Sequence, residues 1–223
     1  MRVRTDAKRE AIVRTAAAVF AEAGFEGASM ADIAARVGGS KATLYGYFAS
    51  KEELFLAVAN LESHKHLHAA MLELNGAHDD VRAELHRFGE KLLNFLLDPQ
   101  TLAVLRMVVA ESGRSSIGRS FYSQGPERGL RVMSQYFKDV IERRRLRSAI
   151  DPSIMAMQFL GLLECELVPR YIYGVHTEAP RAATIRQAAA RAVDVFMDAY
   201  EIAPSHRAAV AIAKPRRSRP KAD

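Results

Sequence analysis

Residues 29–51, SMADIAARVGGSKATLYGYFASK, decide the fold of this chain. In the first half, apolar residues recur at helical spacing, and Ser29 with an acidic residue three positions later predicts a capping box that starts a helix. A glycine pair beginning at Gly38 ends that helix, because glycine adopts the left-handed backbone of a tight turn. Ser40 then predicts the N-cap of a second short helix. Two short helices across a glycine turn form a helix-turn-helix.

The second of these helices has one apolar face and one polar face. Leu44 and Phe48, four residues apart, are expected to face inward. On the outer face, Lys41 is the side chain best able to reach a base edge, whereas the hydroxyl groups nearby suit phosphate oxygens. Gly46 has no side chain and permits close approach to a base. For Tyr45, the alternative is a core position with the hydroxyl at the edge.

This segment resembles the DNA-binding segment of the TetR family of transcriptional regulators. The resemblance covers Gly24-Phe25 and the run ADIAARVGGSKATLYGYFASKEELF from Ala31 to Phe55. One departure is Gly39, where the family more often has a small apolar residue. The resemblance implies that DNA is contacted by Ser40, Lys41, Ala42, Thr43, Tyr45, Gly46, Tyr47 and Lys51.

The composition is that of an ordinary globular protein. A chain of 223 residues can bury a sizeable core, and 49% hydrophobic with 26% charged residues is typical of soluble domains. The single Cys165 excludes an intramolecular disulfide and fits a reducing cytoplasm. Because no apolar run approaches about 20 residues, we expect no membrane span. The start of the chain has no apolar segment, so we expect no signal peptide.

The net charge of +6 is unevenly distributed. Residues 1–51 hold 8 basic and 5 acidic side chains, and residues 203–223 hold 6 and 1, whereas the middle of the chain carries a small negative excess. Positive charge at the two ends suits a polyanionic partner. Charge alone is equally compatible with solvated surface residues.

Helical periodicity continues through the rest of the chain, and no alternating pattern predicts a strand. We therefore expect an all-α protein of about nine helices with an N-terminal three-helix DNA-binding domain. The expected helices besides the helix-turn-helix pair span about 5–23, 51–74, 79–97, 99–112, 117–145 with a break at Gly125-Pro126, 152–173 and 180–201. The expected domains are 1–50 for DNA binding, 51–202 for effector binding and dimerisation, and 203–223 as a basic disordered tail.

The last two long helices are the expected dimer interface. The segment from Ile154 to Leu163 is apolar nearly all round and so needs covering on every side. A buried central helix in a monomer is the alternative. The resemblance implies a homodimer formed by a four-helix bundle, which would place two recognition helices about 34–36 Å apart, or a multiple of that, on a near-palindromic operator. The expected interface residues are Ile154, Gly161, Ile185, Ala189, Val193, Phe196 and Tyr200.

Large apolar side chains between these regions form either a plain core or an effector pocket. The family has its pocket here, and the run FYSQGPERG from Phe121 resembles the AefR-like type of C-terminal domain. Glu111, Glu164 and Glu166 are informative because a carboxylate in apolar surroundings needs a partner or faces a ligand. The expected pocket residues are Phe88, Leu92, Phe95, Leu105, Val108, Glu111, Phe121, Tyr122, Tyr136, Phe159, Leu162, Leu163 and Glu166.

The sequence does not favour an enzyme. It contains no phosphate-binding glycine loop, no HExxH and no nucleophile elbow, and Glu164 and Glu166 point apart at a spacing of two on a helix. His64 and His68 have a spacing that could hold a metal, but no further ligand lies at a matching offset. We expect no metal and no cofactor.

The resemblance implies a ligand-responsive, homodimeric repressor that a small apolar effector releases from double-stranded operator DNA. We expect it to be cytoplasmic. The alternative from another class is a helical interaction module whose head does not bind DNA. The basic tail either adds nonspecific DNA affinity or stays solvated.

Overall fold

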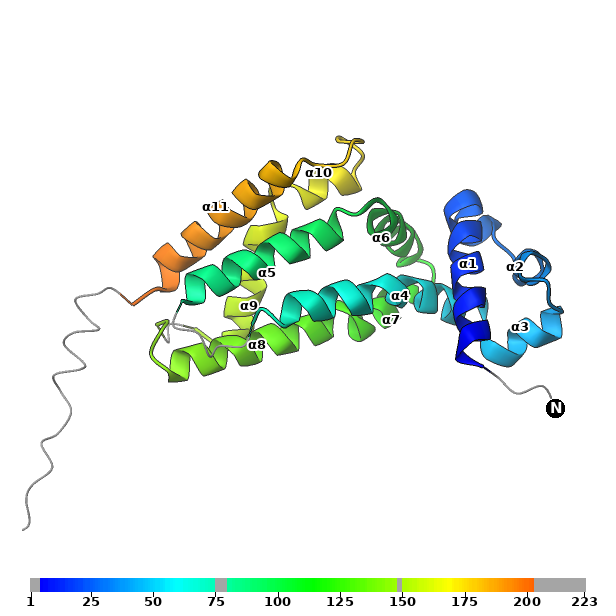
Figure 1. The fold of residues 1–223 in the computed structure, drawn as a ribbon, viewed down its shortest axis with the longest axis horizontal. Coiled ribbons are helices and arrows are strands. Elements are labelled where there is room, and N and C mark those ends of the chain that lie inside the picture. Colours follow the sequence, from blue (N-terminus) through cyan, green and yellow to red (C-terminus); the bar gives the residue numbers. More distant parts are fainter. Residues whose placement is uncertain (1–4, 75–79, 148–149, 203–223) are drawn as a thin grey trace, which may run out of the picture.

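The computed structural model describes residues 5–74, 80–147 and 150–202, with the side chains of residues 61–68 excepted. This part of the chain is all-α, as predicted, and it has no strand beyond an isolated bridge between Leu146 and Glu201. A small head lies at one end of an elongated helical body, and the last helix ends at the other (Figure 1). The helices are α1 (Asp6–Gly27), α2 (Met30–Val37), α3 (Lys41–Tyr47), α4 (Lys51–Met71), α5 (Val81–Leu96), α6 (Pro99–Glu111), α7 (Ile117–Gln124), α8 (Pro126–Glu142), α9 (Pro152–Glu164), α10 (Val168–Ile172) and α11 (Ala182–Tyr200).

The predicted caps of the helix-turn-helix are all present. The Ser29 hydroxyl accepts a hydrogen bond from the Asp32 amide at 3.1 Å, and the Ser40 hydroxyl accepts one from the Thr43 amide at 3.1 Å. Gly38 has φ 70° and ψ 39°, the left-handed conformation that glycine adopts at least cost. These local interactions fix the ends of α2 and α3.

The head is held together by aromatic side chains on both sides of a break in α1. Gly24, with φ 70° and ψ 177°, ends the regular part of the helix as predicted, and the chain then buries Phe25. The Phe25 ring lies 5.3 Å from Phe55 and 5.9 Å from Phe20, centroid to centroid. Because Phe55 belongs to α4, this cluster joins the head to the helix that enters the body.

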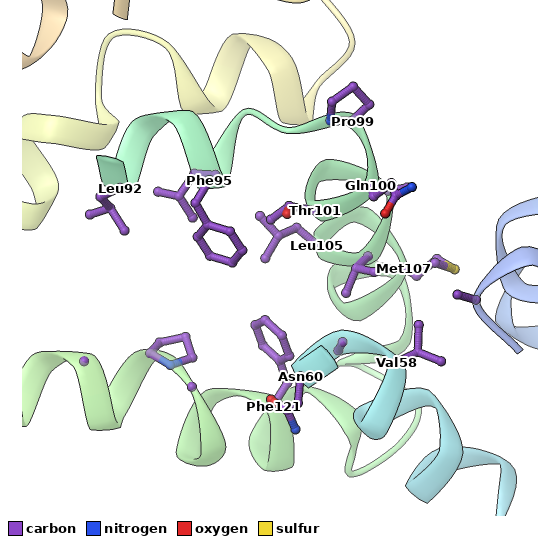
Figure 2. Close-up of a pocket in the computed structure, with 18 of the residues that line it drawn as sticks. Val58, Asn60, Leu92, Phe95, Pro99, Gln100, Thr101, Leu105, Met107 and Phe121 are labelled. Carbon is purple, nitrogen blue, oxygen red and sulfur yellow. The ribbon is translucent and has the colours of Figure 1, made fainter. Parts of the chain in front are cut away.

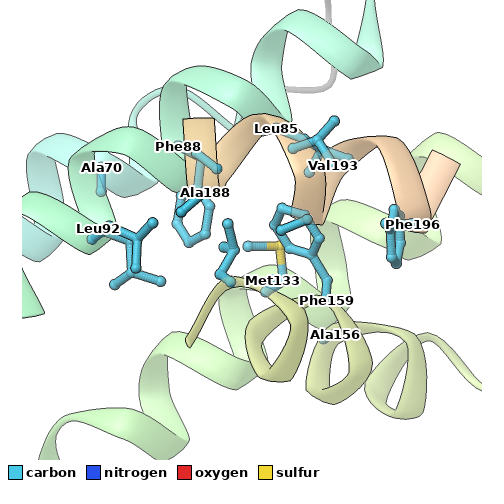
Figure 3. Close-up of a cluster of buried hydrophobic side chains, with 14 of the residues drawn as sticks. Ala70, Leu85, Phe88, Leu92, Met133, Ala156, Phe159, Ala188, Val193 and Phe196 are labelled. Atoms are coloured by element: carbon cyan, nitrogen blue, oxygen red, sulfur yellow. The ribbon is translucent and has the colours of Figure 1, made fainter. Parts of the chain in front are cut away.

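The body is built around a second aromatic core between α5, α8, α9 and α11. Phe159 lies 4.9 Å from Phe196 and 6.0 Å from Phe137, centroid to centroid, and all three rings are fully buried. Fully burying a Phe side chain stabilises a fold by about 1.5–3 kcal/mol, so these rings account for much of the association of the last helices. Figure 3 shows the same core, with α11 closing it.

One polar pair lies inside the body core. The Tyr136 hydroxyl donates a 2.8 Å hydrogen bond to Glu84 Oε2, and both residues are buried. Burial and this bond to Glu84 raise the pKa of Tyr136. The other carboxylate oxygen, Glu84 Oε1, has no partner among the described residues.

The segment 117–145 forms α7 and α8, which meet at Gly125, where the break was predicted. The expected helix 152–173 is divided into α9 and the short α10, which was not predicted. Asp98 and Asp151 cap α6 and α9 through their carboxylates, as predicted. Among the described residues no single helix is long and apolar enough to cross a membrane, and α5 with α6 meets that test only as a pair bent by 70°.

Candidate functional site

The outer face of α3 is open to solvent. Lys41 and Ala42 are exposed, and Tyr45 is 46% exposed, which excludes the core position considered for this tyrosine. Within the described part of the chain, the Lys41 ammonium has no hydrogen-bond or ion-pair partner. Gly46 is similarly unobstructed, because a Cβ atom there would meet nothing within 4 Å. This face is free to approach a duplex.

Two of the expected DNA contacts, Tyr47 and Lys51, bond to parts of the head that are distant in the sequence. The Tyr47 hydroxyl accepts a 3.2 Å hydrogen bond from the Thr5 amide. The Lys51 ammonium donates to the carbonyl oxygens of Phe25 at 2.7 Å and Ala28 at 3.2 Å, and it lies 4.3 Å from the centroid of the Phe25 ring. Lys51 therefore fastens the chain after the α1 break to the start of α4, a role that the sequence did not indicate.

The basic residues of α1 near the chain start are also used within the head. Lys8 Nζ donates to the Val37 carbonyl at 3.4 Å, where a positive charge at the C-terminal end of α2 is favourable. The Arg9 guanidinium lies 5.0 Å from the centroid of the Phe48 ring. Much of the positive charge of the head thus has a structural partner, whereas Lys41 on α3 has none in the part of the chain that the structure describes.

A cavity of about 680 Å³ lies between the head and the body. Side chains from α4, α5, α6 and α7 face one another across it (Figure 2). Its wall passes from exposed residues such as Arg14 and Gln100 to buried ones such as Ala59 and Phe88. Five residues of the predicted pocket line it: Phe88, Leu92, Phe95, Leu105 and Phe121.

The other predicted pocket residues lie elsewhere. Tyr136, Phe159 and Leu163 are buried in the body core, Leu162 packs against that core, and Val108 belongs to the core of the head. Tyr122 is 54% exposed, and Glu111 is buried at the end of α6. Glu166 pairs with Arg191, whose Nε lies 2.8 Å from Glu166 Oε1. These residues do not line this cavity, and the sequence could not separate them from the five that do, because core packing and cavity lining draw on the same residue types.

Sequence reasoning missed the contribution of α1 to the cavity. Arg14, Ala17, Ala18 and Ala21 form part of its wall, together with Val58 and Ala59 of α4. Ala18 and Ala21 are exposed, and Ala17 is partly buried at the edge of the core of the head. Small apolar residues beside the buried stripe of α1 were the available signal.

Glu164, at the end of α9, is the acidic residue in the cavity wall. It is partly buried, and burial raises the pKa of its carboxyl group. Of the three glutamates that the sequence marked as informative, it is the one that faces the cavity. Glu111 and Glu166 are not among the lining residues.

The stripe expected at the dimer interface faces the protein's own interior. Ile185, Ala189, Val193 and Phe196 of α11 are buried against α5 and α9, as Figure 3 shows for Val193 and Phe196. Tyr200 donates to Gln158 within the same chain. Two of the expected interface residues, Ile154 and Gly161 on α9, are exposed, and the large apolar side chains of Met157 on α9 and Val195 on α11 are exposed as well. An amphipathic pattern shows that a helix has a buried face but not what covers it.

No group of three metal-binding side chains occurs among the residues that the structure describes. The side chains of His64 and His68 lie outside them, as does the basic segment 203–223.

Comparison with protein families matches both parts of the chain. Residues 12–58 match the bacterial regulatory proteins of the tetR family, and residues 83–202 match the C-terminal domain of AefR-like transcriptional repressors. The chain belongs to the TetR family of transcriptional regulators. It is therefore a DNA-binding helix-turn-helix regulator and not an enzyme. A comparison with curated proteins gave no match.

Solved structures share the fold over nearly the whole chain. A TetR-family regulator from Mesorhizobium loti MAFF303099 has a TM-score of 0.80 at 24% identity, with 90% of this chain and 100% of that chain covered. The flavonoid-responsive regulator FrrA has a TM-score of 0.71 at 30% identity, covering 88% and 98%. The SmeT–triclosan complex has a TM-score of 0.64 at 20% identity, covering 89% and 94%; SmeT is the repressor of a multidrug efflux pump of Stenotrophomonas maltophilia.

Proposed function

We propose that this TetR-family regulator is a homodimeric repressor that a small apolar effector releases from a near-palindromic operator. The observation that carries the proposal is the shared wall of the cavity, which joins α1 of the DNA-binding head to helices of the body. We divide the chain accordingly into a DNA-binding unit (1–50), an effector-binding and dimerisation unit (51–202) and a basic tail (203–223). A regulator that binds genomic DNA acts in the cytoplasm of a bacterial cell.

The DNA-contacting surface is the open face of α3. Lys41, exposed and without a partner among the described residues, reads base edges, while the hydroxyl groups of Ser40, Thr43 and Tyr45 bind phosphate oxygens. Gly46 supports this arrangement because its unobstructed position allows the backbone to approach the duplex. Tyr47 and Lys51 stabilise this surface through their hydrogen bonds with the Thr5 amide and the Phe25 carbonyl.

The homodimer pairs the outer faces of α9 and α11. Exposed Ile154, Met157 and Gly161 follow one another at spacings of three and four residues along α9, and Val195 is exposed on α11. A second copy would remove these apolar side chains from water. A lone helix-turn-helix reads only one half-site, so two-fold pairing also supplies the second recognition helix.

The effector is a small, mainly apolar, aromatic molecule. A volume of about 680 Å³ lies in the range of sites for drug-sized ligands, and the partly exposed Phe95 and Phe121 provide ring contacts. FrrA is described as flavonoid-responsive and SmeT has been solved with triclosan, and both ligands are aromatic. These neighbours support an aromatic ligand in the corresponding part of this chain.

Release follows from where the ligand binds. A molecule in the cavity contacts α1 and α4 directly, so it favours the arrangement of head and body that accommodates it. A ligand acts only through its preference for one arrangement, and a preference of about 1.4 kcal/mol lowers operator affinity tenfold. Two heads displaced from the spacing of one helical turn no longer fit the two half-sites together.

The proposal is tested by DNA binding of the full chain. Footprinting on the DNA flanking its gene is expected to show a protected, near-symmetric sequence, and Lys41→Ala is expected to lose base preference as well as affinity. An effector candidate that binds the cavity should release the DNA in the same assay. Absence of any protected site, or a monomer in light scattering at micromolar concentration, would contradict the proposal.

A further inference from the structure

The polar side chains of the cavity wall differ in whether the protein satisfies them. Asn60 Nδ2 donates to Gln124 Oε1 at 2.9 Å, Thr101 Oγ1 donates to Asp98 Oδ2 at 3.4 Å, and Arg14 Nη2 donates to Glu10 Oε1 at 2.6 Å. Among the described residues, the Glu164 carboxylate and the Gln100 side-chain amide have no hydrogen-bond or ion-pair partner; Gln100 is exposed, whereas Glu164 is partly buried.

An unpartnered carboxylate in an apolar wall is costly. Removing a charged group from water without compensation is unfavourable, and the protein either neutralises it or supplies a partner. Burial raises the pKa of Glu164, which is the response expected of a carboxyl group that no protein donor stabilises. A bound molecule with a hydrogen-bond donor would stabilise the ionised form.

We infer that the effector is an aromatic molecule that donates a hydrogen bond to the Glu164 carboxylate. This inference rests on the proposed function, in which the cavity is the effector site. A hydrogen bond to an ionised acceptor contributes about twice as much as a neutral one, so this contact orients the ligand while the phenylalanine rings contact its body. The donor is either a neutral hydroxyl or a protonated amine.

The cavity wall disfavours a ligand that carries no hydrogen-bond donor. An anionic or acceptor-only molecule would face the carboxylate, and the basic residue of the wall, Arg14, is already paired with Glu10. Phe95 and Phe121 contribute ring surface and no donor, and Gln100, whose amide could donate, lies on the exposed side of the wall. The cavity therefore selects by the donor that a ligand carries and not only by its apolar volume.

The test compares naphthalene probes that share one ring system. The probes are 2-naphthol and 2-naphthylmethylamine as neutral and charged donors, 2-methoxynaphthalene as an acceptor without a donor, and 2-naphthoate as an anion. Binding to the full chain is measured by equilibrium dialysis and read by naphthalene fluorescence, which tryptophan does not obscure because the chain has none. We expect at least one donor to bind about tenfold or more tightly than 2-methoxynaphthalene, equivalent to about 1.4 kcal/mol. We expect 2-naphthoate to bind most weakly.

Variants of Glu164 and Glu166 test whether the tighter binding of the donor probes depends on Glu164. Glu164→Leu removes the acceptor but keeps a side chain of similar size, so it should abolish the advantage of the donor probes. Glu164→Gln, with a neutral acceptor, should retain part of that advantage. Glu166→Leu is the matched control, because Glu166 pairs with Arg191 away from the cavity. Thermal melting of each variant reports whether it is folded.

The outcomes separate the two proposals. If all four probes bind alike and Glu164→Leu changes nothing, the inference about the donor is overturned while the cavity remains a binding site. If no probe binds a chain that still binds operator DNA, the cavity fails as an effector site and both proposals are overturned. An equal loss in Glu164→Leu and Glu166→Leu would also overturn the assignment to Glu164.

Discussion

The ammonium of Lys51 donates a 2.7 Å hydrogen bond to the carbonyl of Phe25 and lies 4.3 Å from the centroid of that residue's ring. The two residues are 26 positions apart in the sequence. Their contact holds the residues that follow the α1 break at Gly24 against the start of α4. A lysine that the family resemblance places at the DNA is thus also a structural residue. Lys41, which contacts no backbone carbonyl among the described residues, serves as the comparison for this structural role of Lys51.

Lys51→Ala should destabilise the protein by about 1.5–3 kcal/mol, because it removes a charge-assisted hydrogen bond and leaves the Phe25 carbonyl without its donor. Lys41→Ala, a substitution at an exposed position, should change the free energy of unfolding by no more than about 0.5 kcal/mol. Denaturant unfolding measures both values, and a salt-dependent shift assay measures operator affinity. A Lys51→Ala protein as stable as wild type would show that the contact with Phe25 contributes nothing.

Gly46→Ala should separate stability from DNA binding. A Cβ atom at this position meets nothing in the free protein, and alanine is favoured over glycine within a helix by about 0.5–1 kcal/mol. The variant should therefore melt at a higher temperature than wild type. If the α3 backbone approaches the duplex closely at this point, operator affinity should fall at the same time. Unchanged affinity with raised stability would place Gly46 away from the DNA.

The two faces of the last helices should respond differently to substitution. Met157→Glu places a charge on the exposed face of α9, so it should convert the dimer to monomer with little effect on the fold of each chain. Val193→Ala, within the body core, should lower the free energy of unfolding by about 2 kcal/mol and leave the dimer intact. Light scattering with thermal unfolding distinguishes these results. Dimers from Met157→Glu at micromolar concentration would argue against this interface.

Stability should depend on pH through Glu164. Burial raises the folded-state pKa of this carboxyl group above its ordinary value of 4.5. The protonated group therefore contributes favourably to the free energy of unfolding below pH 4.5. The contribution is lost as the pH rises through the folded-state pKa. Glu164→Gln does not titrate, so its melting temperature should exceed that of wild type near pH 7 and approach it near pH 4.5. A constant difference across calorimetric scans from pH 4.5 to 7 would exclude this titration.

Glu166→Gln should give the opposite trend. The hydrogen bond from Arg191 lowers the pKa of Glu166, so its stabilising contribution is present above the ordinary value and is lost as the pH falls through the folded-state pKa. This variant should melt below wild type near pH 7, and the difference should shrink in acid. Opposite slopes for two acids so close in sequence would confirm that their surroundings, and not their position on the chain, set their titration.

Features that depend on neighbouring residues were accessible from the sequence. The caps at Ser29, Ser40, Asp98 and Asp151 and the turn at Gly38 are confirmed, because a side chain that bonds an amide two or three residues away needs no information about the rest of the fold. The all-α class and the family follow from the same local patterns. The break between α9 and α10 was not foreseen, since apolar residues recur at helical spacing on both sides of it and Pro169 lies inside the second piece.

Features that depend on which surfaces meet were not accessible in the same way. The stripe containing Val193 has the pattern of any buried helix face, and only the folded chain shows that α5 and α9 cover it. Phe95 and Phe159 are chemically equivalent, yet one lines the cavity and the other fills the core. Lys51 belonged to a recognised motif, so its bonds to backbone carbonyls were hidden behind the expected role.

The alanines of α1 have a consequence for how this regulator can diverge from its relatives. Ala17, Ala18 and Ala21 belong to the DNA-binding head by their helix and to the cavity by their position. Under the proposed function, a substitution there that adapts the protein to a new effector would also change the side chains that the head presents to the body. Selection for effector specificity and selection for control of the gene would then act on the same three methyl groups.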